Sequence, residues 1–326
     1  MELRISQKPK AKKKILHFEL FYFILPFALF SIALATKYSG DFEELGTSAR
    51  ALGMGGAVVS ASTDPSAIYY NPALCARLPR PSALLMHSED FSGLVKHNFL
   101  GITFPKENQS FGFALLHNGI PGIKLTKLPD TLDTLPSDTN RPYVYRTVNA
   151  NQLICYFNYS RIISSIFGFG GNGKIIYQNL GGTASCFGMG LDFGVIASPL
   201  KDITIGLRVR NLSTAPLLWS TGTKELITPR AAFGVSKLFS LGRDRVQIAF
   251  EAEGAFEEKD FNPNIGLEYA FRNLLFARVG VYRQNLSFGL GFRFKRFHID
   301  YGYASGVAPE ARELGSPQQI SGGVEF

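Results

Sequence analysis

A glycine-rich segment is the first place where this sequence could hold a cofactor. Gly168, Gly170 and Gly173 fit the spacing G-x-G-x-x-G, and Asp192 follows at about the distance of a ribose-binding acid. A dinucleotide site requires a helix after the last glycine, because the helix N-terminus binds the pyrophosphate. The residues that follow, Lys174 to Gln178, instead continue a strand pattern through the glycines. We therefore expect no dinucleotide cofactor.

Other side chains that act in catalysis or metal binding lack the context that those functions need. Asp192-Phe193-Gly194 matches a kinase tripeptide, but the other kinase motifs are missing, and no G-x-S-x-G hydrolase motif occurs. Two sets of possible metal ligands are too dispersed to form a site: His87, His97, His117 and His298, and Cys75, Cys155 and Cys186. The sequence predicts neither an enzyme nor a metal centre, and no cofactor.

The charged residues of the later part of the chain follow a simple rule of position. In one segment, Phe187, Met189 and Leu191 alternate with Gly188 and Asp192. Successive side chains of a strand point to opposite faces, so such charges share one face with the glycines, and the other face is apolar. The residues that keep this parity are Asp192, Arg208, Arg210, Arg230, Glu251, Glu253, Glu268, Arg278, Arg293, Asp300 and Glu325.

Period-2 alternation recurs along most of the chain and excludes helices. A soluble β-sandwich is the alternative to a membrane barrel. The segments are longer than the ~5–6 residues of ordinary strands, and a charge facing lipid near the midplane would cost ~2–4 kcal/mol. We therefore predict an all-β fold, a transmembrane antiparallel β-barrel of about 14 strands with these charges in its lumen. The expected strands are 82–88, 95–104, 110–117, 149–160, 167–178, 185–197, 203–211, 229–238, 245–254, 263–271, 275–282, 286–294, 297–304 and 317–326.

The lengths of the connections test this strand count. The long connections 118–148, 212–228 and 305–316 all fall at one end of the barrel, and the connections at the other end are short. Outer-membrane barrels have short periplasmic turns and long outer loops, so this pattern fixes an orientation. The same register predicts that Glu268 and Arg278 lie opposite each other on neighbouring strands and can pair.

The N-terminus has the features of a cleavable signal peptide. Lys8 to Lys14 form a basic region, Leu20 to Leu34 an apolar region, and Ala33-Leu34-Ala35 a cleavage pattern. A membrane anchor is the alternative, but the apolar stretch is short and contains Pro26. Residues 1–35 carry six basic and two acidic residues, which leaves only +4 of the net charge of +8 to the rest. No basic stripe remains for a nucleic acid.

Residues 36–80 differ from the barrel region 81–326, because they are rich in small residues and show no alternation. Gly53, Gly55 and Gly56 suit close packing, and Asp64 and Asn71-Pro72-Ala73 are turn signals. We predict that this segment is a hatch, or plug, inside the lumen.

The hatch sequence resembles one known family. Gly46 to Ala57, followed by Asp64 and Asn71-Pro72-Ala73, is similar to the N-terminal signature of the PorV/PorQ family of outer-membrane barrel proteins, within the wider FadL-like group. Weaker matches follow in the same order at 266–271, 278–280, 299–301 and 320–326. Where the family usually has glycine after Asn-Pro-Ala, this chain has Leu74-Cys75. The resemblance implies a fourteen-stranded barrel with a hatch.

Two functions follow from this resemblance. PorV-like proteins serve type IX secretion by binding cargo or secretion-system partners, and this is the interpretation that the hatch signature and chain length favour. The alternative is passive transport of a hydrophobic ligand, as in the fatty-acid transporters. The charges predicted for the lumen form either a self-satisfied network or a polar ligand path. Other expected partners are outer-membrane lipid and the barrel-assembly machinery, for which the terminal Phe326 is similar to a recognition signal.

Overall fold

The computed structural model describes residues 40–130, 135–212, 215–255, 261–305 and 315–326. The predicted signal peptide, residues 1–35, lies outside this part of the chain. Within the described residues, no helix is long and apolar enough to cross a membrane.

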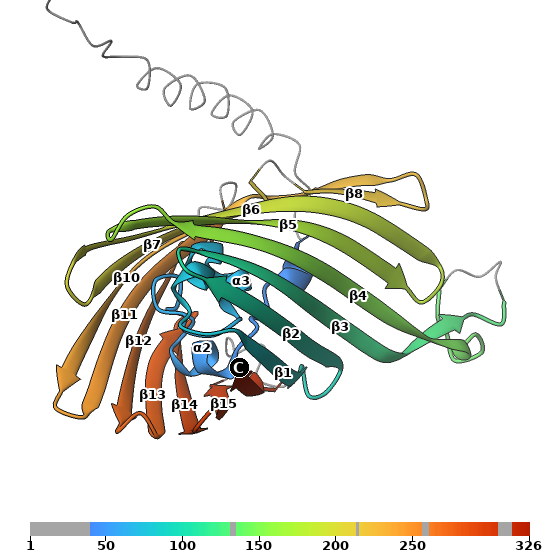
Figure 1. Cartoon of the computed structure of the whole chain (residues 1–326). Coiled ribbons are helices and arrows are strands. Elements are labelled where there is room, and N and C mark those ends of the chain that lie inside the picture. Colours follow the sequence, from blue (N-terminus) through green and yellow to red (C-terminus); the bar gives the residue numbers. More distant parts are fainter. Residues whose placement is uncertain (1–39, 131–134, 213–214, 256–260, 306–314) are drawn as a thin grey trace, which may run out of the picture.

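The predicted all-β barrel of fourteen strands is confirmed. Every strand pairs antiparallel with its neighbours, and the pairings β5–β6 and β1–β16 complete the ring (Figure 1). The barrel strands are β1 (Ser82–Asp90), β2 (Val95–Lys106), β3 (Gln109–Lys127), β4 (Tyr143–Ile162), β5 (Phe167–Leu180), β6 (Ala184–Leu200), β7 (Ile203–Arg210), β10 (Arg230–Leu241), β11 (Asp244–Ala255), β12 (Phe261–Phe271), β13 (Leu275–Tyr282), β14 (Asn285–Phe294), β15 (Phe297–Ala304) and β16 (Gln318–Glu325).

Side chains of the barrel alternate between an apolar exterior and a buried interior. In β6, Phe187, Met189 and Leu191 are 48%, 59% and 55% exposed, whereas Cys186 and Asp192 face inward and are buried. Large apolar side chains are exposed in the same way on every one of the fourteen barrel strands. A water-soluble sheet would not leave so many large side chains uncovered.

Two parts of the predicted loops are strands. β3 and β4 pair beyond their expected ends, as far as Lys127 and Tyr143. The second addition is the hairpin β8 (Ala215–Trp219) and β9 (Lys224–Ile227), in which β8 pairs with β6 where β7 no longer does. The strands of the hairpin are short, and the outer parts of β3 and β4 are exposed on both faces. Neither addition therefore shows a clear period-2 alternation in the sequence.

The two ends of the barrel differ as the connection lengths predicted. At one end, called the turn end here, the strands are joined by short links such as 107–108, 201–202 and 295–296. At the other, the loop end, lie the longer connections 128–142, 211–229 and 305–317.

Residues 40–80 lie inside the barrel as the hatch. It contains four short helices, η2 (Asp41–Glu43), α2 (Ala49–Gly53), α3 (Ala67–Tyr70) and η3 (Pro72–Arg77). Figure 1 shows α2 and α3 enclosed by the strands. The helices are short because glycines and prolines interrupt the chain, for example at Gly55, whose φ is +64°. Nearly all hatch side chains from Thr47 to Ala76 are buried.

Cysteine labelling tests the orientation of the two ends. With the native cysteines replaced by alanine, Asp138→Cys at the loop end should react with an impermeant maleimide on intact cells. Arg243→Cys at the turn end should react only after the outer membrane is permeabilised, because short turns face the periplasm. The opposite pattern would contradict the orientation.

Candidate functional site

Glycines of the barrel wall allow the hatch backbone to lie directly against the strands. A Cβ atom added at Gly266 would collide with the carbonyl oxygen of Met54, and one at Gly280 with the amide nitrogen of Gly55. At Gly53 the added atom would lie 2.8 Å from the Cα atom of Gly289. Only glycine fits such backbone contacts. The hatch occupies the space on the inward side of the strands, and for this reason glycines share the inward parity with the charges.

The hatch residues singled out from the sequence lie together in this plug. All seven are buried, namely Gly53, Gly55, Gly56, Asp64, Asn71, Pro72 and Ala73. Asp64 accepts a hydrogen bond from the amide of Ser66 at 2.8 Å, which shapes the entry to α3. Their functional role stays a prediction.

Asn71 joins two parts of the hatch to the barrel wall. Its Oδ1 accepts a hydrogen bond from the amide of Ala73 at 3.1 Å and caps η3, in which Pro72 is the first residue. Its Nδ2 donates to the carbonyl oxygens of Val59 at 2.8 Å and Val195, on β6, at 3.2 Å. The side chain is fully buried, so alanine at this position would leave two carbonyl groups with one partner fewer.

The charges predicted for the lumen all face the hatch or the mouths of the lumen, on the inward side of their strands. They are Asp192, Arg208, Arg210, Arg230, Glu251, Glu253, Glu268, Arg278, Arg293 and Asp300, together with Glu325. Most belong to two ion clusters, one toward each end of the barrel. In both clusters a hatch residue supplies one of the charges.

The turn-end cluster consists of Arg50, Glu268, Arg278 and Asp300. Arg50 lies on α2, and its Nε is 2.9 Å from Oε2 of Glu268. Arg278 contacts the same Glu268 oxygen at 2.6 Å and Asp300 Oδ1 at 2.6 Å. Glu268 and Arg278 are direct cross-strand partners, at the register expected from the sequence. Removing one member of a buried pair costs about 3–5 kcal/mol, so this cluster holds α2 firmly.

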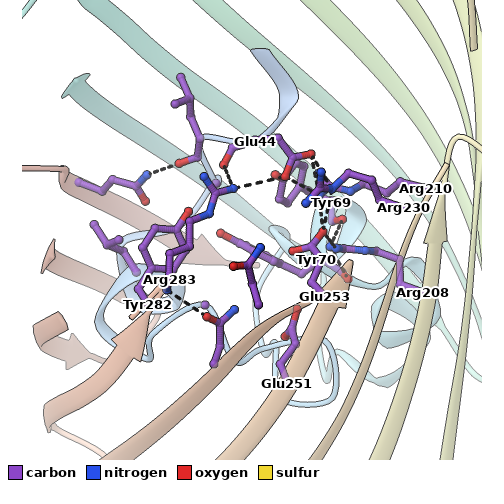
Figure 2. Close-up of a pocket in the computed structure, with 17 residues that line it drawn as sticks. Glu44, Tyr69, Tyr70, Arg208, Arg210, Arg230, Glu251, Glu253, Tyr282 and Arg283 are labelled. Carbon is purple, nitrogen blue, oxygen red and sulfur yellow. Dashed lines mark hydrogen bonds and ion pairs between the residues drawn. The ribbon is translucent and has the colours of Figure 1, made fainter. Parts of the chain in front are cut away.

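The loop-end cluster consists of Glu44, Arg208, Arg210, Arg230, Glu253 and Arg283. Figure 2 shows the arginines converging from opposite walls on two carboxylates. Glu253 Oε1 lies 2.6 Å from Arg208 and 2.7 Å from Arg210. Glu44, from the hatch, lies 3.1 Å from Arg210 and 3.4 Å from Arg283. The hatch thus adds a second carboxylate to a cluster in which the wall supplies four arginines and one glutamate.

Two further carboxylates attach the hatch to the wall. Glu251 Oε2 accepts hydrogen bonds from the amides of Val58 and Val59, each at 2.8 Å. Glu43 Oε1 lies 2.6 Å from Nζ of Lys174, which also contacts Asp192 at 3.1 Å. The hydroxyl of Tyr156 donates to Glu43 at 2.8 Å.

Several of these partners were not singled out from the sequence. Arg50 is the single charge in the segment 46–57, and Lys174 has the inward parity of its strand, so the sequence pattern could have indicated both as hatch contacts. Glu43 and Glu44 precede the hatch motif, and no pattern in the sequence indicated their role. His97 and Asn118 hold the same part of the hatch: His97 bonds to the carbonyl oxygen of Gly46 and to Asn118 Oδ1, and Asn118 donates to the carbonyl oxygen of Phe42.

The other half of the lumen wall carries most of the large apolar side chains that face inward, together with polar ones such as Asn172, which donates to the carbonyl oxygen of Ile68 at 2.7 Å. Inward side chains on β2 to β6 pack against α3 and η3 of the hatch, where Ile68, Leu74 and Cys75 are buried, and those of β1 join the same apolar cluster. We call this contact the apolar seam. Its wall residues are Leu84, Met86, Phe99, Ala114, Leu116, Ile154, Tyr156, Ile176 and Ile196.

A cavity lies on each side of the hatch, and no residue lines both. The loop-end cavity, of about 40 Å³, is bounded by the loop-end cluster with Tyr69, Tyr70 and Tyr282. The turn-end cavity, of about 260 Å³, is bounded by the turn-end cluster with Asp64 and Arg293. Ligand pockets usually measure about 300–1,000 Å³, so a molecule of that class passes only if the hatch moves.

Comparisons with known proteins reveal the fold but no family. No family model matches the chain, and no curated protein matches it. The toluene transporter TodX of Pseudomonas putida is similar with a TM-score of 0.59 and 14% identity, over 86% of this chain and 99% of that chain. The monoaromatic hydrocarbon channel CymD gives 0.58 and 12%, over 86% and 98%. A Pseudomonas aeruginosa FadL homologue gives 0.53 and 12%, over 86% and 98%.

At these identities the likeness shows a shared barrel fold. It agrees with the wider FadL-like group predicted from the sequence and leaves membership of the PorV/PorQ family a prediction.

Substitution of a wall glycine tests the fit of the hatch. Gly266→Ala should displace the hatch, because the methyl group would overlap Met54; overpacking costs about 1–3 kcal/mol, enough to speed tryptic cleavage at Arg50 roughly tenfold. Gly173→Ala is the matched control, since a Cβ atom there meets nothing within 4 Å. Equal resistance of Gly266→Ala and the unsubstituted protein to trypsin would contradict this account of the fit.

Proposed function

We propose that this protein is an outer-membrane channel through which small hydrophobic molecules pass without energy input when the hatch moves aside. The fold likeness supports it, because the similar structures include one described as a toluene transporter and one described as a monoaromatic hydrocarbon channel. We infer no catalytic role. This function is the alternative predicted from the sequence. The comparisons support it better than they support a role in secretion.

The exterior of the barrel supports placement in the outer membrane. Closed barrels satisfy all strand hydrogen bonds internally, as a bilayer requires. The exposed large apolar side chains provide the surface that lipid would cover. Phe326, which follows β16 and is 57% exposed, has the position proposed for recognition by the barrel-assembly machinery.

The asymmetry of the hatch contacts is the observation that carries the proposal. Moving the hatch away from β7 and β10 to β15 would break buried ion pairs, at about 3–5 kcal/mol for each charge left unpaired. Moving α3 and η3 away from β2 to β6 would break hydrogen bonds such as that from Asn172 to the carbonyl oxygen of Ile68, but no ion pair among the described residues. A hydrophobic molecule that enters there keeps the apolar surface away from water. The apolar seam is therefore the route of least cost for a hydrophobic molecule.

The first described part of the hatch, residues 40–46, closes the loop end of the apolar seam. We call it the N-terminal arm. On the side of β2 to β5 it is held by Glu43 with Lys174 and Tyr156, by Gly46 with His97 and by Phe42 with Asn118. On the other side, Glu44 belongs to the loop-end cluster. Entry from the loop end requires these contacts to open.

Secretion support remains the second candidate. The hatch signature favours it, and so does the exposed part of β3 and β4 described below. The two functions differ in what a loosened hatch would do. A channel should leak small solutes after Asn71→Ala, whereas a sealed Asn71→Ala barrel that loses export of its cargo would favour secretion support.

Uptake measurements test the channel directly. Cells that make the protein should take up radiolabelled toluene faster than cells without it, and take up glucose no faster. Lys174→Gln should raise toluene uptake at least about tenfold, because ~1.4 kcal/mol lost from the closed state shifts a two-state equilibrium tenfold.

Lys201→Gln serves as the control for charge, since Lys201 lies in an exposed turn and should leave uptake unchanged. If the correctly folded protein does not speed toluene uptake and Lys174→Gln does not either, the channel proposal fails.

A further inference from the structure

The outer parts of β3 and β4 form a two-stranded ribbon that projects from the loop end (Figure 1). The last pairing of β2 with β3 is Lys96 with Gly119, and the last pairing of β5 with β4 is Ala150 with Leu180. Beyond these points β3 and β4 pair only with each other among the described residues. The ribbon therefore presents two strand edges without a partner strand.

The two edges are protected to different degrees. The β3 edge carries Pro121, a register shift beside it, and the lysines Lys124 and Lys127. Proline, irregularity and lysine are the features with which natural sheets prevent another strand from adding to an edge. The β4 edge from Tyr143 to Thr147 has no proline and no lysine, although it too has a register shift, at Tyr145 between Val144 and Arg146. The β4 edge therefore carries fewer protective features than the β3 edge and is the better suited of the two to strand addition.

The β4 edge also has a composition that forms strands readily. Tyr143, Val144 and Tyr145 are 52%, 49% and 45% exposed, and aromatic and β-branched residues of this kind favour strands. These residues lie seven to five positions beyond Ala150, where the neighbouring strand has already ended. Their apolar surface thus lies beyond the belt that lipid would cover, and it would gain from contact with another polypeptide.

The charge of the ribbon defines the chemistry of a partner. Lys124, Lys127 and Arg146 have no acidic partner among the described residues, and Nζ of Lys127 lies 4.3 Å from the centre of the Tyr145 ring. The neighbouring Arg141 is already paired with Asp138 at 2.9 Å. An added strand would meet a positive surface and should carry acidic side chains.

We propose that the free edge of β4, from Tyr143 to Thr147, binds an acidic, extended segment of another protein as an additional strand. Backbone hydrogen bonds to the edge supply affinity, and carboxylates beside Arg146 and Lys127 supply specificity. This surface is separate from the lumen, and its function is independent of whether hydrophobic molecules pass through the barrel.

Peptide binding tests the proposal on the full chain in detergent micelles. The probe is a fluorescent, end-capped peptide of six alternating glutamate and valine residues. Its fluorescence anisotropy should rise saturably with protein concentration. A peptide with lysine in place of glutamate should not bind, and neither should the acidic peptide with methylated backbone nitrogens, because strand addition needs its N–H groups.

Two variants separate the β4 edge from the general charge of the ribbon. Arg146→Glu should weaken the acidic peptide at least about tenfold and create binding of the lysine peptide, a gain that misfolding cannot produce. Lys124→Glu makes the same change of charge on the protected β3 edge and should weaken the acidic peptide less.

Three results would overturn the proposal: no saturable binding of the acidic peptide, equal binding of the methylated peptide, or equal effects of the two variants. If the protein instead forms dimers, and Arg146→Glu dissociates them, the partner of the edge is a second copy of this chain.

Discussion

The structure depends on one constraint, the burial of an irregular stretch of backbone inside a closed barrel. In the hatch, amide and carbonyl groups of short helices and turns are removed from water and must find partners in the wall or in the hatch itself. Glu251 accepts from two consecutive amides, Asn71 donates to two carbonyl groups, and Arg50 reaches the carbonyl oxygen of Ala61. The wall must therefore supply charged and amide side chains where the hatch backbone is exposed, and glycine where the two backbones touch.

This constraint explains what the sequence could and could not predict. The inward parity of glycines and charges, the fourteen strands and the side of the long connections all follow from period-2 alternation, which local sequence displays. The outer parts of β3 and β4 are strands exposed on both faces, and such strands show no alternation. The pairing of Glu268 with Arg278 follows from the strand register, but the partners that lie on the hatch are hidden, because Glu43 and Lys174 are separated by 131 positions and Arg50 and Glu268 by 218. A charge visible in a strand therefore predicts a face, but its partner on an irregular segment has no periodic signal.

One half of the wall binds the hatch through ion clusters and the other carries most of the large inward apolar side chains, and this division supports the proposed transport. Ion pairs are directional and costly to break singly, whereas apolar contacts can be exchanged for other apolar contacts at little cost. Once the N-terminal arm is released, a hatch anchored by ion pairs on one side and by apolar packing with single hydrogen bonds on the other can open on this second side and keep its anchor. The two cavities described in the lumen are small and bounded by the ion clusters, and for this reason the cavities themselves do not indicate a hydrophobic ligand.

Methyl NMR spectra of the protein in micelles, recorded during a titration with toluene, test this central claim most directly. The methyl groups of Ile68 on the hatch and of Ile154 and Ile176 on the wall lie on the apolar seam, and Val59 contacts Gly234 on the opposite side. The account predicts saturable shifts of the three isoleucine signals and an unchanged Val59 signal. Shifts of Val59 without shifts of the isoleucines, or no saturable shift at any of them, would contradict it.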